Sequence, residues 1–446
     1  MSTKLVNIIN YILFSLVLFT ASNFYIIKET LHTFWPFLVL YVAINLFPIF
    51  ILPRTKRLQT CAQGTALLIE FLGSTALSIL LFLLGFTNLL TVDTIFYNPK
   101  LWVANTLIVI IMEAIVFWNG MLRIFFASEQ LGIKVRIKAI VCGLIPIVHL
   151  FVLGEMIKIV ANEVTLENKK IILDEKRHSQ QICATKYPIL MVHGVFFRDF
   201  RYFNYWGRIP KALETNGATI FYGNHQSAAS VVTSGQEIAA RILQIVAETG
   251  CDKVNIIAHS KGGLDCRSAL TIPGIAQHVA TLTTVSTPHR GCEFADYLLT
   301  NIPEKEQQTV AQTYNAALQK LGDPNPDFLA AVNNLTVSFC NQFNQTVQDV
   351  PGVLYQSIGS KLNRASGGRF PLNFTYHLAK FFDGPNDGLV CANSFPWGSS
   401  YQLLSVNGPR GISHGDMIDL NRENILEFDV REFYVQLVAN LKQRGF

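Results

Sequence analysis

The sequence predicts two parts of different fold class: an N-terminal α-helical membrane bundle and a C-terminal α/β domain, with a mostly parallel sheet and helices on both faces. Three observations support this division. Half of the 446 residues are hydrophobic, and only 15% are charged, against about 25% in ordinary globular chains. Long apolar segments follow one another in the first third of the chain. Short apolar runs alternate with helical patterns in the rest.

The N-terminal region, residues 1–160, contains five apolar segments. They cover residues 5–27, 34–52, 71–90, 102–121 and 139–153. A helix rises about 1.5 Å per residue, so about 20 residues cross a hydrocarbon core about 30 Å thick. We therefore expect about five transmembrane helices, the first of them a retained anchor and not a cleaved signal peptide. The fifth segment is short and crosses only if it extends to residue 160.

The excess of basic charge lies among these segments. Residues 1–160 hold 11 Lys and Arg and 6 Asp and Glu, whereas residues 161–446 hold 25 of each, so the first region carries the whole net charge of +5. Basic residues in short loops mark the cytoplasmic side. With five crossings, the clusters in 54–57 and 123–138 are cytoplasmic, which predicts an integral membrane protein with its C-terminal domain on the extracytoplasmic side. With four crossings, that domain is cytoplasmic. This distribution does not indicate a nucleic-acid groove, and we expect no nucleic-acid partner.

One carboxylate, Glu113, falls in the middle of the fourth apolar segment. An ionisable group inside a membrane span is a functional candidate by default. No charged partner stands at a recognisable spacing from Glu113, so we expect a structural hydrogen bond there. Beyond the spans, residues 161–182 are polar and of mixed charge and predict a connector to the α/β domain, residues 183–446.

The strongest motif in the α/β domain surrounds Ser260. A strand-like run, 254–258, leads into the residues HSKGG and then into a helical stretch. This order places Ser260 at the apex of a tight strand-to-helix turn, where only small residues fit two positions before and after the nucleophile. Ala258 and Gly262 occupy those positions. A serine in a glycine-rich loop is more often a turn or cap residue, so the motif gains its weight from its context.

The context consists of two further strand-like runs that end in loops. Residues 187–192 run into His193-Gly194, and residues 279–285 end at the sequence STPHRG. A strand followed by His-Gly is where such folds turn the backbone to offer an oxyanion-hole N–H. All three runs end at the carboxyl edge of the predicted parallel sheet, which is where open α/β sheets hold their sites.

A serine nucleophile needs a base, and the base needs an orienting carboxylate. In this architecture they follow the serine in the order acid, then histidine. His414, in a polar loop before a C-terminal helical stretch, is the best-placed base. Asp387, in the turn NDGLV, is the preferred acid, and Asp383 is the second choice. Asp416 is too close to His414 in sequence to be preferred.

Five sequence blocks together resemble the bacterial triacylglycerol lipases with the α/β-hydrolase fold. They are, in chain order, YPILMVHGVFFR (187–198), VNIIAHSKGGLDCR (254–267), STPHRG (286–291), NDGLV (386–390) and SHGD (413–416). The resemblance covers residues 183–446 and does not include the membrane region. Its specificity comes from the recurrence of all five blocks in the order of the family.

The resemblance implies the roles of the site residues. Ser260 is the expected nucleophile, Asp387 the acid and His414 the base, and the backbone N–H groups of Val195 and Lys261 are the expected oxyanion hole. We expect the Lys261 ammonium to be solvated. The reaction implied is the hydrolysis of a carboxylic ester of a lipid through an acyl-enzyme. Many such lipases carry a helical lid, and residues 294–343 form a long insertion of that kind, although ordinary surface helices give the same pattern.

The resemblance also concerns a metal. Family members often bind a structural calcium through an aspartate just after the catalytic histidine and another well upstream of the triad acid. Asp416 matches the first position, but residues 359–376 contain no acidic side chain for the second. We therefore expect neither a metal nor another cofactor.

Taken together, the sequence predicts a membrane-anchored serine hydrolase, with a lipid ester as substrate and the lipid bilayer as its other partner. Two alternatives stay open. An acyltransferase or phospholipase uses the same triad, and a catalytically silent binding domain on a membrane anchor keeps the fold. Labelling by a fluorophosphonate distinguishes the silent domain from the enzymes.

Overall fold

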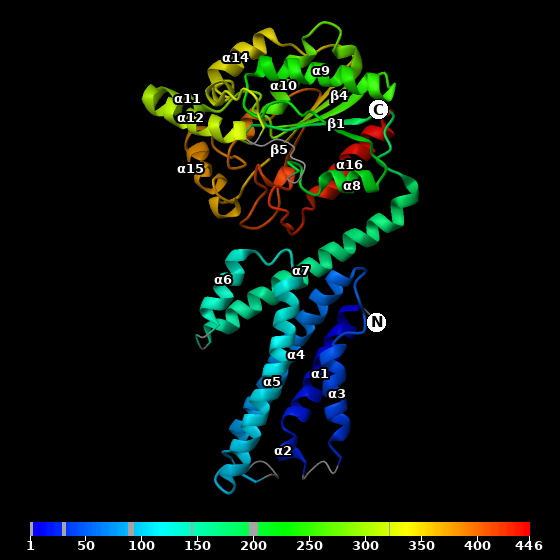
Figure 1. The fold of residues 1–446 in the computed structure, drawn as a ribbon, viewed down its shortest axis with the longest axis vertical. Coiled ribbons are helices and arrows are strands. Elements are labelled where there is room, and N and C mark those ends of the chain that lie inside the picture. Colours follow the sequence, from blue (N-terminus) through cyan, green and yellow to red (C-terminus); the bar gives the residue numbers. More distant parts are fainter. Residues whose placement is uncertain are drawn as a thin grey trace. The chain divides into compact units, whose positions relative to one another are not determined.

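The computed structural model describes residues 3–28, 33–87, 93–143, 145, 147–195, 204–320 and 322–446. The chain divides into two compact units, Met1–Glu175 (unit 1) and Lys176–Phe446 (unit 2), and Figure 1 labels most of their helices and some of the strands. Some predicted features lie partly outside the described residues. These are residues 88–90 of the third apolar segment, 144 and 146 of the fifth, 196–198 of the first block and 321 of the insertion.

Unit 1 is helical. Its helices are α1 (Thr3–Ser22), α2 (Phe24–Ile27), α3 (Trp35–Leu46), α4 (Lys56–Leu84), α5 (Pro99–Ala127), α6 (Ile133–Cys142) and the greater part of α7 (Val148–Arg177). Glycines let α4 and α5 approach closely. A Cβ on Gly64 would lie 2.7 Å from Cγ2 of Ile124, and a Cβ on Gly120 would lie 2.9 Å from Cγ of Leu68. Small residues at such a crossing are typical of helices packed in a bilayer.

Two helices of the described part of the chain, α4 and α5, are long and apolar enough to cross a membrane. Helices α1 and α3 are apolar but shorter over Val6–Ser22 and Trp35–Leu46. Helix α3 ends at Leu46 because Pro48 follows, and the residue before a proline is pushed out of the helical region. The fifth apolar segment is divided between α6 and α7. A bundle of about five spans therefore stays a prediction.

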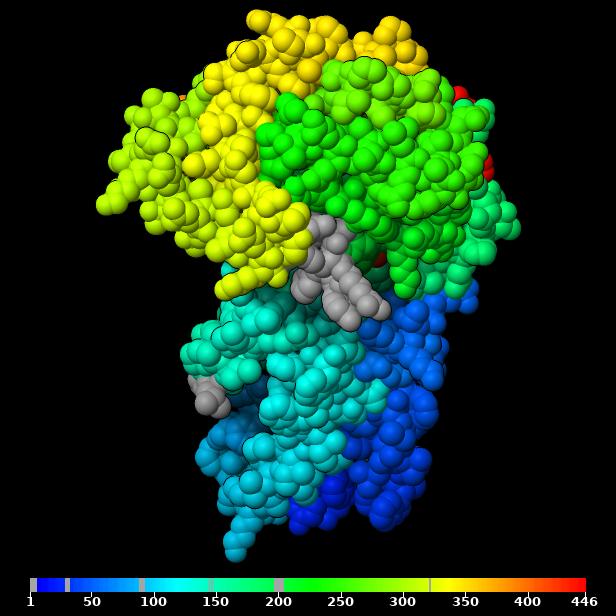
Figure 2. All heavy atoms as spheres, turned by 45° about the horizontal axis from the view of Figure 1, so that its top comes forward, coloured from blue at the N-terminus to red at the C-terminus, as the bar shows by residue number. Residues whose placement is uncertain are grey.

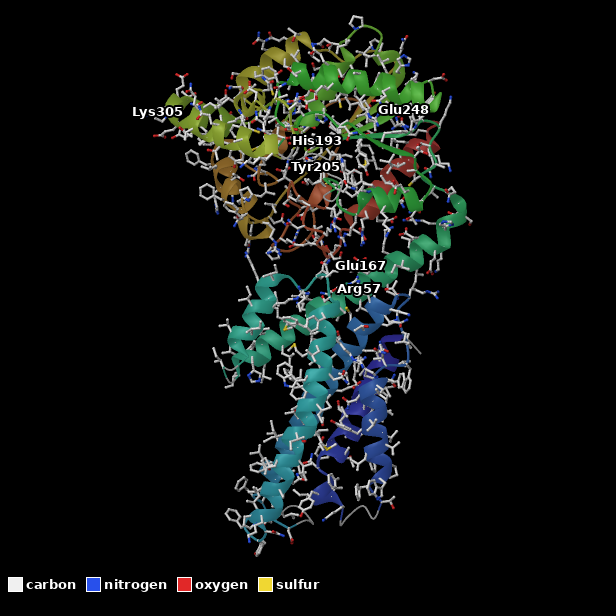
Figure 3. All side chains as sticks on the ribbon, in the orientation of Figure 1. Arg57, Glu167, His193, Tyr205, Glu248 and Lys305 are labelled. Atoms are coloured by element: carbon white, nitrogen blue, oxygen red, sulfur yellow. The ribbon has the colours of Figure 1, made fainter. Side chains whose placement is uncertain are left out.

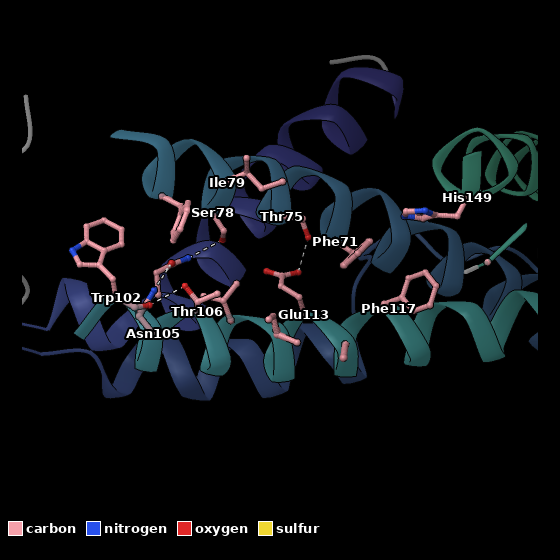
Figure 4. A pocket seen from close by; sticks show the side chains of 16 residues that line it. Phe71, Thr75, Ser78, Ile79, Trp102, Asn105, Thr106, Glu113, Phe117 and His149 are labelled. Atoms are coloured by element: carbon pink, nitrogen blue, oxygen red, sulfur yellow. Dashed lines mark hydrogen bonds between the residues drawn. The ribbon is translucent and has the colours of Figure 1, made fainter. Parts of the chain in front are cut away.

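The hydrogen-bonding prediction for Glu113 is confirmed. Its carboxylate accepts bonds from the hydroxyls of Ser74 at 2.5 Å, and of Thr75 and Ser22 at 3.4 Å. Ser74 and Thr75 lie on α4 and Glu113 on α5, so these bonds connect the two long helices. Glu113 also lines a cavity of about 560 Å³ (Figure 4).

Unit 2 is built on a six-stranded sheet in the order β2-β1-β3-β4-β5-β6, in which every neighbouring pair is parallel. The strands are β1 (Ile189–Val192), β2 (Ile220–Tyr222), β3 (Val254–His259), β4 (Val279–Val285), β5 (Leu354–Ser360) and β6 (Ser400–Leu404). The central strands β1, β3 and β4 are buried along their whole length, as expected for a parallel sheet covered on both faces.

Helices cover both faces of this sheet (Figure 1). Met191, Ile257 and Val285 point to the face covered by α8 (Ile209–Thr215) and α16 (Val430–Gln443). The alternate residues of the same strands, such as Leu190 and Ile256, point to the face covered by α9 (Val231–Thr249) and α10 (Lys261–Leu270). This alternation follows from the two-residue period of a strand. The predicted parallel α/β fold of this part of the chain is confirmed.

The segment predicted as a lid is helical. It contains α11 (Glu293–Asn301), α12 (Glu304–Lys320), α13 (Phe328–Asn333) and α14 (Val337–Thr346), and a further helix, α15 (Leu372–Asp383), follows β5. In Figure 2 the insertion, in yellow-green to yellow, forms part of the surface of unit 2 beside the green segment that includes α9. All eight cysteines of the chain are free thiols.

Candidate active site

The turn at Ser260 has the geometry of a nucleophile elbow. Strand β3 ends at His259, helix α10 begins at Lys261, and Ser260 between them has φ +54° and ψ −132°. This conformation is strained for a residue with a side chain, and strained backbone of this kind is concentrated at functional sites. The Ser260 N–H donates to the carbonyl of Val285 at 2.9 Å, and the Thr287 hydroxyl donates to the Ser260 carbonyl at 2.7 Å.

The residues around Ser260 must be small because the backbone of residues 193–195 passes very close to the turn. A Cβ on Gly262 would collide with the carbonyl oxygen of His193, and a Cβ on Gly194 would lie 2.8 Å from Cβ of Ser260. The His-Gly segment and the residue after it, 193–195, therefore pass directly beside the elbow; we name this segment the HG loop. The prediction that only a small residue fits two positions after Ser260 is confirmed at Gly262.

Two backbone N–H groups next to Ser260 have no hydrogen-bond acceptor among the described residues. One belongs to Lys261, the first residue of α10, and the other to Val195, which follows Gly194 in the HG loop. N–H groups placed in this way can bind an oxyanion that develops at a carbonyl attacked by the Ser260 hydroxyl. Their assignment as the oxyanion hole stays a prediction.

Asp387 and His414 are joined by a hydrogen bond. The Nδ1 atom of His414 lies 2.7 Å from Oδ2 of Asp387, and the His414 N–H donates to the Asp387 carbonyl at 2.8 Å. The other carboxylate oxygen of Asp387 accepts the N–H groups of Leu389 at 3.0 Å and Val390 at 2.8 Å. Both side chains are buried. The carboxylate is thus fixed by three donors, one of which is the imidazole.

The imidazole of His414 lies beside the elbow. Its ring centroid is 4.4 Å from that of His259, the residue immediately before Ser260. The Ser260 hydroxyl has no hydrogen bond to any described residue, His414 included. Catalytic hydrogen bonds are often long without substrate and shorten when the substrate binds. The structure brings Asp387 and His414 together and places the His414 ring beside His259, the residue before Ser260.

The two other candidate acids have different partners. Asp383 accepts the N–H of Glu293 at 3.2 Å. Asp416 is held by the Arg410 guanidinium, with Nη1–Oδ2 at 2.8 Å and Nη2–Oδ1 at 3.1 Å, and it accepts the Ser413 N–H at 2.8 Å. Neither carboxylate bonds to the His414 ring. The Arg410–Asp416 pair stabilises the loop that carries His414.

Asp416 does not fit the role of a calcium ligand, because the bidentate contact with Arg410 already neutralises its carboxylate. Among the described residues, no group of three or more His, Cys, Asp or Glu side chains is arranged to hold a metal ion. The expectation that the chain takes no metal stays a prediction.

The structure adds one residue to the site, Tyr205, which no motif or spacing in the sequence indicates. Its hydroxyl accepts the Gly194 N–H at 3.0 Å and hydrogen-bonds to Nδ1 of His259 at 2.7 Å, so it connects the HG loop to the elbow. Figure 3 shows Tyr205 close to His193 in unit 2. Burial lowers the pKa of His259 well below 6.5, which keeps this ring uncharged beside His414.

The predicted solvation of the Lys261 ammonium is wrong. The side chain is only 2% exposed, and its Nζ lies 2.6 Å from Oδ1 of Asp265 and 3.2 Å from the Ser234 hydroxyl. Burial raises the pKa of Asp265 to about 7, although the ammonium beside it acts in the opposite direction. Both partners belong to α10 and both are buried. The ammonium is therefore paired with a carboxylate of its own helix and does not contact solvent.

Comparisons with known proteins found a family model and several lipases that this chain resembles. A family described as "PGAP1-like alpha/beta domain" matches residues 234–320. Triacylglycerol lipases of Vibrio cholerae and Pseudomonas fragi are 30% and 34% identical to this chain over 293 and 296 residues. These matches cover 60% and 58% of this chain, and 91% and 98% of the two lipases.

Other matches are shorter or more remote. Two further curated triacylglycerol lipases match over 174 residues, and this chain spans about half of their length, 54% and 48%. Among solved structures, the mature form of the Bacillus licheniformis lipase BlEst2 is 23% identical, with a TM-score of 0.42. That match covers 57% of this chain and 92% of the BlEst2 chain.

Proposed function

We propose that this chain, which belongs to the family of the triacylglycerol lipases, is a membrane-anchored serine hydrolase of lipid carboxylic esters. The chain is similar to the lipases of Vibrio cholerae and Pseudomonas fragi over nearly their whole length. Both of these proteins are carboxylic ester hydrolases. The observation that carries the proposal is the Asp387–His414 hydrogen bond beside the strained turn at Ser260.

In the proposed mechanism, His414 takes the proton of the Ser260 hydroxyl as its oxygen attacks the ester carbonyl. The N–H groups of Val195 and Lys261 hydrogen-bond to the oxyanion of the tetrahedral intermediate. The intermediate expels the alcohol, which receives the proton from His414. A water molecule, deprotonated by His414, then attacks the acyl-enzyme, and the second tetrahedral intermediate releases the fatty acid as the Ser260 oxygen takes the proton back from His414. Asp387 orients the imidazole and stabilises its charged form in both steps.

Anchoring in a membrane is supported by the surfaces of α4 and α5. A core helix of a soluble protein buries most of its apolar residues. Only 28% and 22% of the most apolar windows of α4 and α5 are buried in unit 1. Leu83 of α4 and Ile111 of α5, for example, are exposed. Apolar surface of this extent is stable in contact with lipid chains and not with water. We propose that both helices cross the bilayer and, with five crossings in all, that unit 2 lies on the extracytoplasmic side.

A lid function of the insertion is supported by its contact with the HG loop. Leu318 of α12 and Ala331 of α13 pack in one cluster with Val195. The carboxylate of Asp323, between these helices, accepts the N–H of Ser227 at 3.1 Å and its hydroxyl at 2.5 Å. A displacement of this insertion would therefore change the surroundings of the predicted oxyanion hole.

The proposal is tested with nitrophenyl esters from acetyl to palmitoyl and the detergent-solubilised full chain. We expect turnover that peaks at medium or long acyl chains, its loss in Ser260→Ala, and its retention in Ser268→Ala, a control on the same helix. Turnover confined to the acetyl ester would contradict the lipid substrate. If no ester is turned over, fluorophosphonate labelling of Ser260 would favour an acyltransferase, and failure to label would favour the silent binding domain.

A further inference from the structure

Helix α15 exposes a line of large aromatic side chains. Phe370, just before the helix, and Phe374 and Phe381 within it are 84%, 66% and 82% exposed. Phe374 and Phe381 are seven residues apart, which places them within about 20° of one another around a helix of 3.6 residues per turn, whereas Phe370 lies in the turn before α15. We name Phe374 and Phe381 the aromatic stripe. Helix α15 is labelled in Figure 1.

The opposite side of α15 contacts the loops that hold the predicted acid and base. Leu372 packs so closely that a Cβ on Gly388 would lie 2.9 Å from its Cβ, and a Cβ on Gly415 would lie 3.5 Å from its Cδ1. Gly388 follows Asp387, and Gly415 follows His414. The Thr375 hydroxyl also donates to the Gly388 carbonyl. One short helix therefore exposes the aromatic stripe on one side and supports Asp387 and His414 on the other.

The chemistry of α15 indicates a lipid surface as the partner of this stripe. Isolated exposed apolar residues are ordinary, but two highly exposed phenylalanines on one face of a short helix, with Phe370 in the turn just before it, form a larger apolar surface. Helices that lie in a membrane interface carry such residues on one face and basic residues beside them. Lys380 supplies a basic group on α15. The one acidic residue of the helix, Asp383, is at its C-terminal end and accepts the Glu293 N–H.

We propose that the aromatic stripe docks unit 2 on the lipid–water interface of the bilayer from which it takes its substrate. The inference rests on the proposed function, because it assigns the ester to a lipid of the same membrane. A helix is about 10 Å in diameter. With the stripe in the interface, the loops of Asp387 and His414 lie about one helix diameter from the lipid, within reach of an ester near the head groups.

The first test compares two rates of the full chain reconstituted in lipid nanodiscs. One substrate is a water-soluble short-chain ester, and the other is a long-chain acylglycerol in the same bilayer. For the double variant Phe374→Asp/Phe381→Asp, we expect the rate on the acylglycerol to fall at least tenfold and the rate on the soluble ester to change less than twofold. The conservative Phe374→Leu/Phe381→Leu pair keeps both rates. The control Val232→Asp, at a 60% exposed position on α9, also keeps both.

Two outcomes of this comparison, and one result of a separate measurement of oligomeric state, would overturn the docking surface. Equal loss of both rates would mean that the stripe acts only through the loops of Asp387 and His414. Unchanged rates would mean that the stripe has no role in access to the lipid. Conversion of a dimer to a monomer in detergent by the aspartate pair would assign the stripe to a contact between two copies of the chain.

A second test does not depend on activity and therefore separates a failure of this inference from a failure of the proposed function. The variants Phe374→Trp and Val232→Trp are reconstituted with lipids brominated on their acyl chains. We expect additional quenching of tryptophan emission, relative to the unsubstituted chain, for Phe374→Trp and not for Val232→Trp. Equal quenching of the two variants, or none for Phe374→Trp, would overturn the inference even if the chain hydrolyses lipid esters.

Discussion

The substitution Asp387→Asn tests the proposed triad most sharply, because the structure fixes how the new amide must lie. Oδ1 of Asp387 accepts two backbone N–H groups, from Leu389 at 3.0 Å and Val390 at 2.8 Å. An asparagine must keep its oxygen on that side, since its NH2 group would meet two donors there. The NH2 group then faces Nδ1 of His414, where the carboxylate oxygen lies 2.7 Å away.

This orientation reverses the tautomer of the base. An amide that donates to Nδ1 leaves the proton of the neutral imidazole on Nε2, which then cannot accept the Ser260 proton. In the triad of a serine protease, the same change lowers kcat by about 10⁴, which corresponds to roughly 5 kcal/mol of transition-state stabilisation. We expect a loss of the same order for Asp387→Asn, with KM changed little because the Asp387 side chain is fully buried.

The assay is the steady-state hydrolysis of the best nitrophenyl ester, with circular dichroism to verify that the variant folds. Asp383→Asn is the matched control, since its carboxylate bonds to Glu293 and not to the His414 ring, and we expect its kcat to stay within about twofold. A folded Asp387→Asn variant with more than a tenth of the original kcat would refute the role of Asp387. Loss of activity in Asp383→Asn instead would transfer that role to Asp383.

Three further predictions concern the surroundings of the site. Gly262→Ala places a methyl group against a backbone carbonyl of the HG loop, and we expect at least a tenfold lower kcat; unchanged kinetics would contradict this tight contact. Arg410→Gln leaves the buried Asp416 carboxylate without its bidentate partner. We expect the free energy of unfolding to fall by about 1–3 kcal/mol, which is measured as a lower Tm. An unchanged Tm would mean that the Arg410–Asp416 pair has no structural role. Burial lowers the pKa of His259 and of His289 well below 6.5, so below that pH the unfolded chain binds protons that the folded chain excludes. The free energy of unfolding should therefore fall as the pH drops below about 6.5, by up to roughly 1.4 kcal/mol per pH unit for each ring. In His289→Gln the fall should be less steep by up to roughly 1.4 kcal/mol per pH unit, the share of that one ring, and a profile as steep as that of the unsubstituted chain would exclude His289 as a contributor.

Much of the sheet was predictable because buried parallel strands are nearly continuous apolar runs. The run 254–258 corresponds to β3, Val254–His259, and the run 279–285 corresponds to β4, Val279–Val285. The turn at Ser260 was predictable for a related reason. Its backbone demands small neighbours, and that demand is visible in the sequence as Ala258 and Gly262.

The contacts that depend on tertiary packing were not predictable. Tyr205 reaches His259 across 54 positions of the chain, and no spacing rule marks such a pair. Lys261 has a charged side chain that is usually solvated, and only the packing of α9 against α10 buries it. In unit 1, hydropathy indicated apolar segments but not their helix lengths, because α4 begins at Lys56, in a more polar sequence well before the segment 71–90.

The most direct measurement of the central claim is covalent labelling of the detergent-solubilised full chain with a fluorophosphonate, followed by mass spectrometry of its peptides. The proposed triad predicts one stoichiometric adduct, on the Ser260 hydroxyl, that disappears in His414→Ala although Ser260 is still present. An adduct on a different serine, or labelling of Ser260 that is equally fast without His414, would contradict the proposal that Ser260 is a nucleophile activated by the Asp387–His414 pair.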